Sequence, residues 1–153
     1  MEIRLARQGD IGGLLALLLQ VGQVHHHIRP DIFPDGMQKY DEAALISLLQ
    51  DETRPIYVAA EGSQVRGYCF CVVKDLQVGN LHHREFYIDD LCVEETHRRK
   101  GIAQALYRHA LQQAQQHQCH SLTLNVWCGN DSAQKFYESM GMRPRNIMME
   151  TKL

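Results

Sequence analysis

The sequence of 153 residues contains no apolar run that approaches the roughly 18 residues needed to cross a bilayer. Its first ten residues have no basic stretch followed by an apolar one, which is the pattern of a secretory leader. We therefore expect a cytoplasmic protein without membrane contact. Internal repeats, low-complexity segments and linker-like compositions are also missing, and 44% of the residues are hydrophobic. These features predict a single domain over residues 1–153.

An excess of positive charge is missing as well. The formal net charge is only -2, so we expect no nucleic-acid partner. The five cysteines form an odd set without paired metal-ligand spacing, which is typical of reduced, buried thiols. Three consecutive histidines, His25 to His27, cannot easily converge on one ion, so the sequence predicts no metal site.

The most informative stretch runs from Tyr87 to Tyr107, where the hydrophobic period changes once. Residues 87–93 alternate as in a strand, whereas the apolar residues from Ile102 onwards recur at helical spacing. The basic turn 98–103 lies between them and contains Gly101. A helix N-terminus offers unpaired N–H groups and the positive end of its dipole, and a glycine lets a ligand approach the main chain. This junction therefore predicts a site for a phosphate or pyrophosphate.

The patterns on either side predict the remaining elements. Near the N-terminus we expect a strand over 3–6 and a helix that Asp10 caps and that ends at Gly22, followed by a loop over 25–36 because of its two prolines and its glycine. A second helix should begin after Asp41 and end before Pro55. Three strands over 56–60, 65–78 and 83–93 should then form an antiparallel meander. A helix from 102 to about 117 and a parallel strand over 121–127 should follow. The last elements are a helix after Asn130, which Gly141 stops, and a closing strand over 147–153.

This order of elements resembles the GCN5-related N-acetyltransferase family over essentially the whole chain. The residues Ile88–Val93 followed by Arg98–Ala103 are similar to the family's acetyl-coenzyme A motif. Asn130, Ala133, Tyr137 and Gly141 match its N-x-x-A-x-x-x-Y-x-x-x-G pattern. The resemblance implies an α/β fold with a central, mixed, mostly antiparallel and twisted sheet of six or seven strands, and about four helices on both faces. It also implies acetyl-CoA as co-substrate and direct transfer of its acetyl group to an amine.

The resemblance further implies which residues hold the coenzyme. The main chain of the strand before the turn would bind the pantetheine arm and polarise the thioester carbonyl. The turn would cradle the pyrophosphate, and residues of the later motif would contact the coenzyme from the other side. The strand residues are Leu91, Cys92 and Val93; the turn residues are Arg98, Arg99, Lys100, Gly101, Ile102, Ala103 and Gln104; the later ones are Asn130 and Ala133.

The same comparison places a general acid at Tyr137, which would protonate the departing thiolate if it lies within hydrogen-bond reach. The other interpretation of Tyr137 is a core residue beside Phe136.

A lysine-like amine is mostly protonated at neutral pH, so a base is also required. Family members place a carboxylate on one face of the strand, which favours Asp89, then Asp90 and then Glu85. A bulge near Leu91 would exchange the strand's two faces.

The sequence leaves open the role of Cys92 and the identity of the acceptor. Cys92 as an acyl-carrying nucleophile is an alternative to direct transfer. The acceptor is also open: residues Arg29, Asp31, Phe33 and Glu85 are the candidates for binding it. Nearby carboxylates suit a small cationic amine similar to a diamine, whereas Arg29 suits an anionic group. A protein lysine or N-terminal amine is a second possibility, and a coenzyme-binding regulatory module without turnover is a third. Family members often dimerise, so a homodimer is expected.

Overall fold

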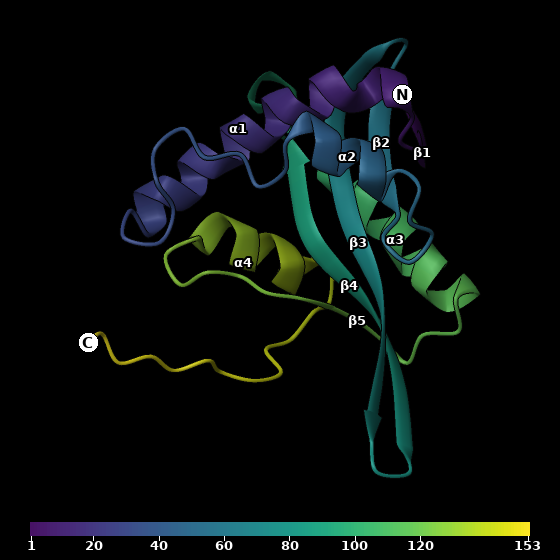
Figure 1. The fold of residues 1–153 in the computed structure, drawn as a ribbon, viewed down its shortest axis with the longest axis vertical. Helices are drawn as coiled ribbons and strands as arrows, with labels where there is room; N and C mark the ends of the chain where they lie inside the picture. The colour runs from purple at the N-terminus through teal and green to yellow at the C-terminus, as the bar shows by residue number, and fades with distance from the viewer.

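The fold is built on a twisted five-stranded sheet in the order β1-β2-β3-β4-β5. The computed structural model describes all 153 residues. Strands β1 to β4 pair antiparallel, and β5 pairs parallel to β4. The bounds are Glu2–Leu5 for β1, Ile56–Glu61 for β2, Gln64–Val78 for β3, Leu81–Val93 for β4 and Ser121–Leu124 for β5. The far ends of β3 and β4 project from the body as a long hairpin (Figure 1).

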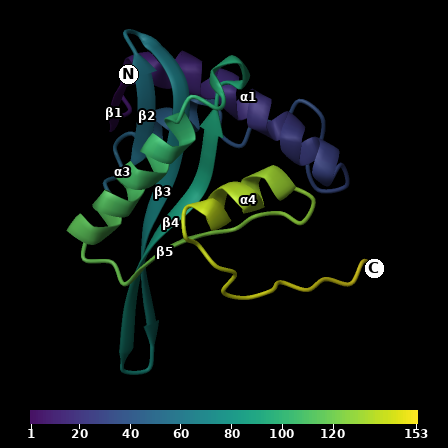
Figure 2. The same ribbon diagram turned by 180° about the vertical axis from the view of Figure 1, so that it is seen from behind.

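Four helices cover the two faces of this sheet, as expected. They are α1 over Ile11–Ile28, α2 over Glu42–Leu48, α3 over Ile102–Gln116 and α4 over Asp131–Ser139. Helices α1 and α2 pack on one face around Leu14, Leu18 and Leu45, each fully buried. Helix α3 packs on the other face with Leu106 and Ala110 inward, and Phe136 and Tyr137 of α4 join that core. The view from behind shows α3 crossing the sheet (Figure 2). None of the helices has the length and apolarity to cross a membrane.

A β-bulge at Asp89 interrupts the pairing of β3 with β4. Phe70 pairs with Asp90 but the next residue, Cys71, pairs with Ile88, so Asp89 has no partner across the ladder. The extra residue exchanges the faces of β4 beyond this point. Phe86 and Ile88 before the bulge lie in the core beneath α3, whereas Cys92 beyond it lies in the core beneath α1.

The sheet is smaller than the six or seven strands that we expected. Residues 147–153 form no strand, and this end of the chain is irregular and runs away from the sheet (Figure 1). Strand β5 ends at Leu124 rather than at Trp127. An isolated apolar run such as Ile147–Met149 has strand-like composition, but a strand also needs a neighbour to pair with. This tail finds none within its own chain.

The expected end of the first helix at Gly22 is also wrong. Helix α1 continues to Ile28 through the three histidines, and only residues from Arg29 onwards form the loop. Glycine weakens a helix by about 1 kcal/mol, which packing can override. Here Gly22 is buried because the Met37 carbonyl oxygen lies against it. Asp10 does not cap α1 with its side chain; its carboxylate instead accepts hydrogen bonds from Arg4 at 2.8 and 3.0 Å.

Replacing Gly22 with alanine tests this close approach. A methyl group there would overlap the Met37 carbonyl oxygen, so we expect a loss of roughly 1–3 kcal/mol in unfolding free energy. Gly12 lies in the same helix with open space around its Cα, so Gly12→Ala should instead stabilise by up to about 1 kcal/mol. Urea unfolding measures both. Equal effects of the two substitutions would show that the loop does not press on α1.

Candidate active site

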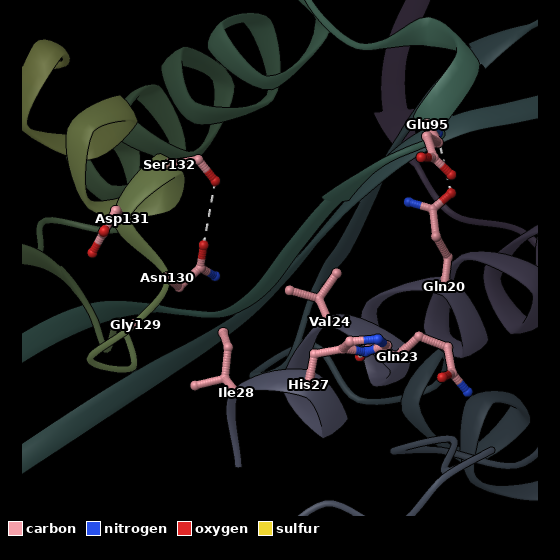
Figure 3. A pocket seen from close by; sticks show the side chains of 10 residues that line it. All are labelled: Gln20, Gln23, Val24, His27, Ile28, Glu95, Gly129, Asn130, Asp131 and Ser132. Carbon is pink, nitrogen blue, oxygen red and sulfur yellow. Dashed lines mark hydrogen bonds between the residues drawn. The ribbon is translucent and has the colours of Figure 1, made fainter. Parts of the chain in front are cut away.

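A cleft opens where β4 and β5 separate. Their pairing ends at Ile88 and Leu124; β4 runs on to Val93 while the chain after β5 turns towards α4. Beyond this point a cleft of about 620 Å³ is lined by α1, by Glu95 just after β4 and by residues 129–132 at the start of α4. Val24 and His27 of α1 lie across it from Asn130, which precedes α4, and Glu95 closes the end beyond β4 (Figure 3).

Beyond Ile88, β5 no longer pairs with β4, so the main-chain N–H and C=O groups on that edge of β4 have no partner strand. The Glu94 N–H donates to the Arg66 carbonyl oxygen of the β3 side at 2.8 Å. Main-chain groups of successive strand residues point to opposite edges, so those of Cys92 face β3 and those of Leu91 and Val93 face the opening. The Val93 carbonyl oxygen accepts a hydrogen bond from the Gln20 side chain at 3.0 Å, as this orientation requires.

The basic turn before α3 forms a concave array of N–H groups. Arg99 and Gly101 both have positive φ, 62° and 79°, and successive residues of alternating hand direct their N–H groups to one point. None of the N–H groups from 99 to 104 has an acceptor within the protein. The side chains of Arg98, Arg99 and Lys100 are exposed and form no ion pair. This array fits a pyrophosphate.

Asp89 and Asp90 face the same side of the sheet because of the bulge. The Asp89 Oδ2 atom accepts a hydrogen bond from Tyr40 and forms an ion pair with Lys39, each at 2.9 Å. Asp90 accepts from Tyr68 at 2.8 Å. Burial raises the pKa of Asp90 despite this hydrogen bond. Burial, with the Asp89 contact, raises the pKa of Tyr40 to about 12, so Tyr40 remains a hydrogen-bond donor to Asp89 at neutral pH.

Tyr137 lies on α4, on the other side of β4. Its ring packs against Phe136 and Tyr107 at centroid distances of 5.1 and 6.4 Å. Burial raises its pKa, and the charges of Cys69 and Asp90 add to that rise. The phenol therefore keeps its proton at neutral pH and lies within electrostatic range of Asp90.

Cys92 is a poor candidate for a nucleophile. Its side chain is buried, and its Sγ lies 3.4 Å from Gln20 Nε2 and 3.7 Å from the Leu17 carbonyl oxygen. Burial, with the Asp90 charge, raises the pKa of this thiol to about 12. Only a thiolate attacks a thioester efficiently, so this environment favours direct transfer.

The structure separates Glu85 from the other carboxylates. Its side chain is buried in an ion pair with Arg145 and accepts a hydrogen bond from Thr123 at 3.4 Å. Asp89 lies four residues further along the strand, at a distance of about 13 Å. Glu85 thus holds the segment after α4 against the sheet.

The other predicted substrate residues gather beyond the end of α1. Arg29 pairs with Asp31 at 2.8 Å and with Glu150 of the tail at 2.6 Å, and its guanidinium lies over the Trp127 ring at 5.9 Å. Phe33 packs against Trp127 at 5.2 Å and against His25 at 5.0 Å. The charge of Asp90 acts on His25, although burial lowers the pKa of that imidazole overall. His25 thus packs against Phe33 and lies within electrostatic range of Asp90.

Sequence reasoning missed His25, Lys39 and Tyr40. His25 continues the inward spacing of Leu14, Leu18 and Val21 along α1, so the helical period was a usable signal once Gly22 is allowed inside the helix. Lys39 and Tyr40 lie in an irregular segment without periodicity. Only the folded chain brings them to Asp89.

Comparison with known proteins identifies the family of this chain. The model of the acetyltransferase (GNAT) family matches residues 21–142, which is most of the chain. The chain belongs to the GNAT family. Members of this family are acetyl-CoA-dependent N-acetyltransferases, and the cleft, the N–H array and the open edge of β4 lie within the matched residues.

Several individual proteins are similar to this chain. GCN5-related N-acetyltransferase 6, chloroplastic, of Arabidopsis thaliana is 27% identical over 89% of the chain, which spans only 43% of that relative's length. A crystal structure of a mutant of the BH1408 protein from Bacillus halodurans is 28% identical, with a TM-score of 0.94 over 100% of this chain and 99% of that one. An aminoglycoside 6'-N-acetyltransferase from Acinetobacter haemolyticus shares the fold, with a TM-score of 0.71 and 18% identity over 100% of this chain and 99% of that one.

Thiol alkylation tests the buried environment of Cys92. At neutral pH we expect iodoacetamide to modify the exposed Cys128 rapidly and Cys92 at least tenfold more slowly, because the protonated, buried thiol is unreactive. Peptide mass spectrometry assigns the sites, and Cys128→Ser should remove the fast phase. Fast modification of Cys92 in the folded protein would contradict this and restore the covalent route.

Proposed function

We propose that this GNAT protein transfers the acetyl group of acetyl-CoA directly to a primary amine of a small cationic molecule. The residues from Arg98 to Gln104 would hold the pyrophosphate, and Asn130 and Ala133, at the start of α4, would contact the coenzyme across the cleft. The N–H groups of Leu91 and Val93 would bind the pantetheine arm and orient the thioester. The main chain of Cys92 faces β3, so we do not expect Cys92 to bind the coenzyme with its own N–H group.

Proton transfer requires one acceptor and one donor near the thioester. Asp89 follows Ile88, the last residue of β4 that pairs with β5, and is the proposed base, acting through water on an external amine because its side chain is short. Asp90 is the second candidate, because burial raises its pKa and so makes its carboxylate a stronger base than an exposed one. Tyr137, protonated and on the opposite side of the strand, is the proposed acid for the departing sulfur.

The ion pair of Lys39 with Asp89 is the observation that carries the choice of a cationic amine. A protein ammonium group already lies 2.9 Å from the proposed base and 5.7 Å from the centroid of the Tyr40 ring. The same environment attracts a substrate ammonium by charge and by cation–π contact. Phe33, Asp31 and Arg29 would contact the remainder of the substrate.

Coenzyme A release measured against a panel of amines tests this function. We expect turnover with at least one small diamine or polyamine, a loss of roughly 10²-fold or more in kcat for Asp89→Asn, and a smaller loss for Tyr137→Phe. Asp75→Asn on the projecting hairpin is the matched control and should keep full activity.

Three outcomes separate the alternatives. Turnover with peptides only would indicate a protein acceptor. Coenzyme binding without thiol release for any amine, unchanged in the Asp89 and Tyr137 variants, would indicate a regulatory module. An Asp89→Asn enzyme with full kcat would remove Asp89 as the base and leave Asp90 to be tested in the same way.

We also propose that the protein is a homodimer through its C-terminal tail. Ile147, Met148 and Met149 are 82%, 93% and 83% exposed within one chain, and the outer edge of β5 has no partner strand. A second copy offers this edge a strand and covers these side chains, which a single chain leaves in water.

Light scattering coupled to size exclusion measures this directly. We expect twice the chain mass for the intact protein and a single chain mass after deletion of residues 147–153. The double variant Ile147→Asp, Met149→Asp should act like the deletion because it puts charge at the interface. Deletion of the final two residues alone is the control. A monomeric intact protein would overturn the proposal.

A further inference from the structure

We propose that Lys39 is a self-acetylation site, which receives an acetyl group from acetyl-CoA when no acceptor amine is present. This inference rests on the proposed function, because it uses the same donor and the same base. The product would be acetyl-lysine at position 39, a residue that belongs to no sequence motif.

The segment around Lys39 is held in place by both of its neighbours. The Gln38 side chain donates to the Leu15 carbonyl oxygen of α1 at 3.0 Å. Tyr40 donates to Asp89, accepts from Arg54 at 2.9 Å and stacks on Phe70 at 5.4 Å. Anchoring on both sides delivers the Lys39 ammonium to Asp89 in a defined geometry, so the effective concentration of this amine at the base is high.

The ion pair of Lys39 and Asp89 lies at the point where the thioester is expected. Asp89 immediately follows Ile88, the last residue of β4 paired with β5, and Leu91, two residues later, directs its main chain to the edge of β4 that β5 leaves open. The Asp89 side chain is 16% exposed, while that of Lys39 is 40% exposed and thus remains accessible to a donor. The Oδ1 atom of Asp89 has no partner within the protein and stays available to a water or a proton.

The transfer balances with the groups already described. The Lys39 ammonium gives one proton to Asp89, with which it is directly paired, and the lone pair on Nζ then forms a bond to the acetyl carbon as the carbon–sulfur bond breaks. The sulfur leaves with the bonding electrons and takes the proton of Tyr137. The second proton released by the nitrogen restores Tyr137, and Asp89 returns its proton to solvent. The net products are acetyl-lysine, coenzyme A and one proton.

Acetylation of Lys39 would have a consequence for the acceptor site. It removes the positive charge that competes with a substrate ammonium for Asp89, but it adds a bulkier neutral group at the same place. The modified protein should therefore bind cationic amines differently from the unmodified one. An external amine must therefore displace the Lys39 ammonium from Asp89 before it can be acetylated.

The test is incubation of the full chain with acetyl-CoA alone, followed by peptide mass spectrometry. The chain has four other lysines, Lys74, Lys100, Lys135 and Lys152, whose acetylation reports the uncatalysed background. We expect Lys39 to be acetylated at least tenfold faster than Lys135, which is exposed on α4, at a rate independent of protein concentration. Asp89→Asn should bring Lys39 to the background rate, and a saturating diamine substrate should suppress the reaction.

The variants Lys39→Arg and Lys135→Arg form the matched pair. The first keeps the positive charge without an acceptor amine and should abolish fast acetyl incorporation; the second should leave it intact. Thermal unfolding checks that each variant is folded. If an external amine is acetylated while Lys39 stays at background, the self-acetylation proposal is overturned and the proposed function stands. If acetyl-CoA binds but neither amine is acetylated, both fail.

Discussion

The β-bulge at Asp89 is the constraint on which the site depends. A regular strand would direct neighbouring carboxylates to opposite faces of the sheet, one beneath α1 and one beneath α3. The extra residue instead puts Asp89 and Asp90 on the side of Tyr40, Tyr68 and Lys39. It also falls immediately after the last residue of β4 that pairs with β5. A single irregularity therefore sets both where the strands separate and what chemistry faces the opening.

The parts around the bulge divide the tasks of an acyl transfer between different elements. The turn before α3 keeps its N–H groups free of internal acceptors, which suits an anion held at a distance from the reaction. The exposed main-chain edge of β4 faces the cleft beside it. In the proposed mechanism, Tyr137 on α4 and the carboxylates on β4 act from opposite sides of that strand, so the proton of Tyr137 is not transferred directly to a carboxylate.

Much of this was predictable from the sequence, and the errors have physical causes. The change of hydrophobic period at residues 87–107 predicted β4, the turn and α3, because periodicity reports burial directly. The end of α1 was misplaced because Gly22 weakens a helix locally, whereas contact with Met37 favours glycine there. The closing strand was wrong because strand composition does not supply a partner strand. The position of the bulge was also unpredictable, since it depends on the register between β3 and β4.

We propose that acetyl-CoA binds along the open edge of β4 with its pyrophosphate in the turn before α3. Amide-resolved NMR titration with acetyl-CoA tests this binding mode. We expect the largest shifts at the N–H groups of Arg99 to Gln104 and at those of Leu91 and Val93, with the Cys92 amide less affected because it faces β3. Shifts that spare the turn and β4, or that concentrate on the projecting β3–β4 hairpin, would contradict it.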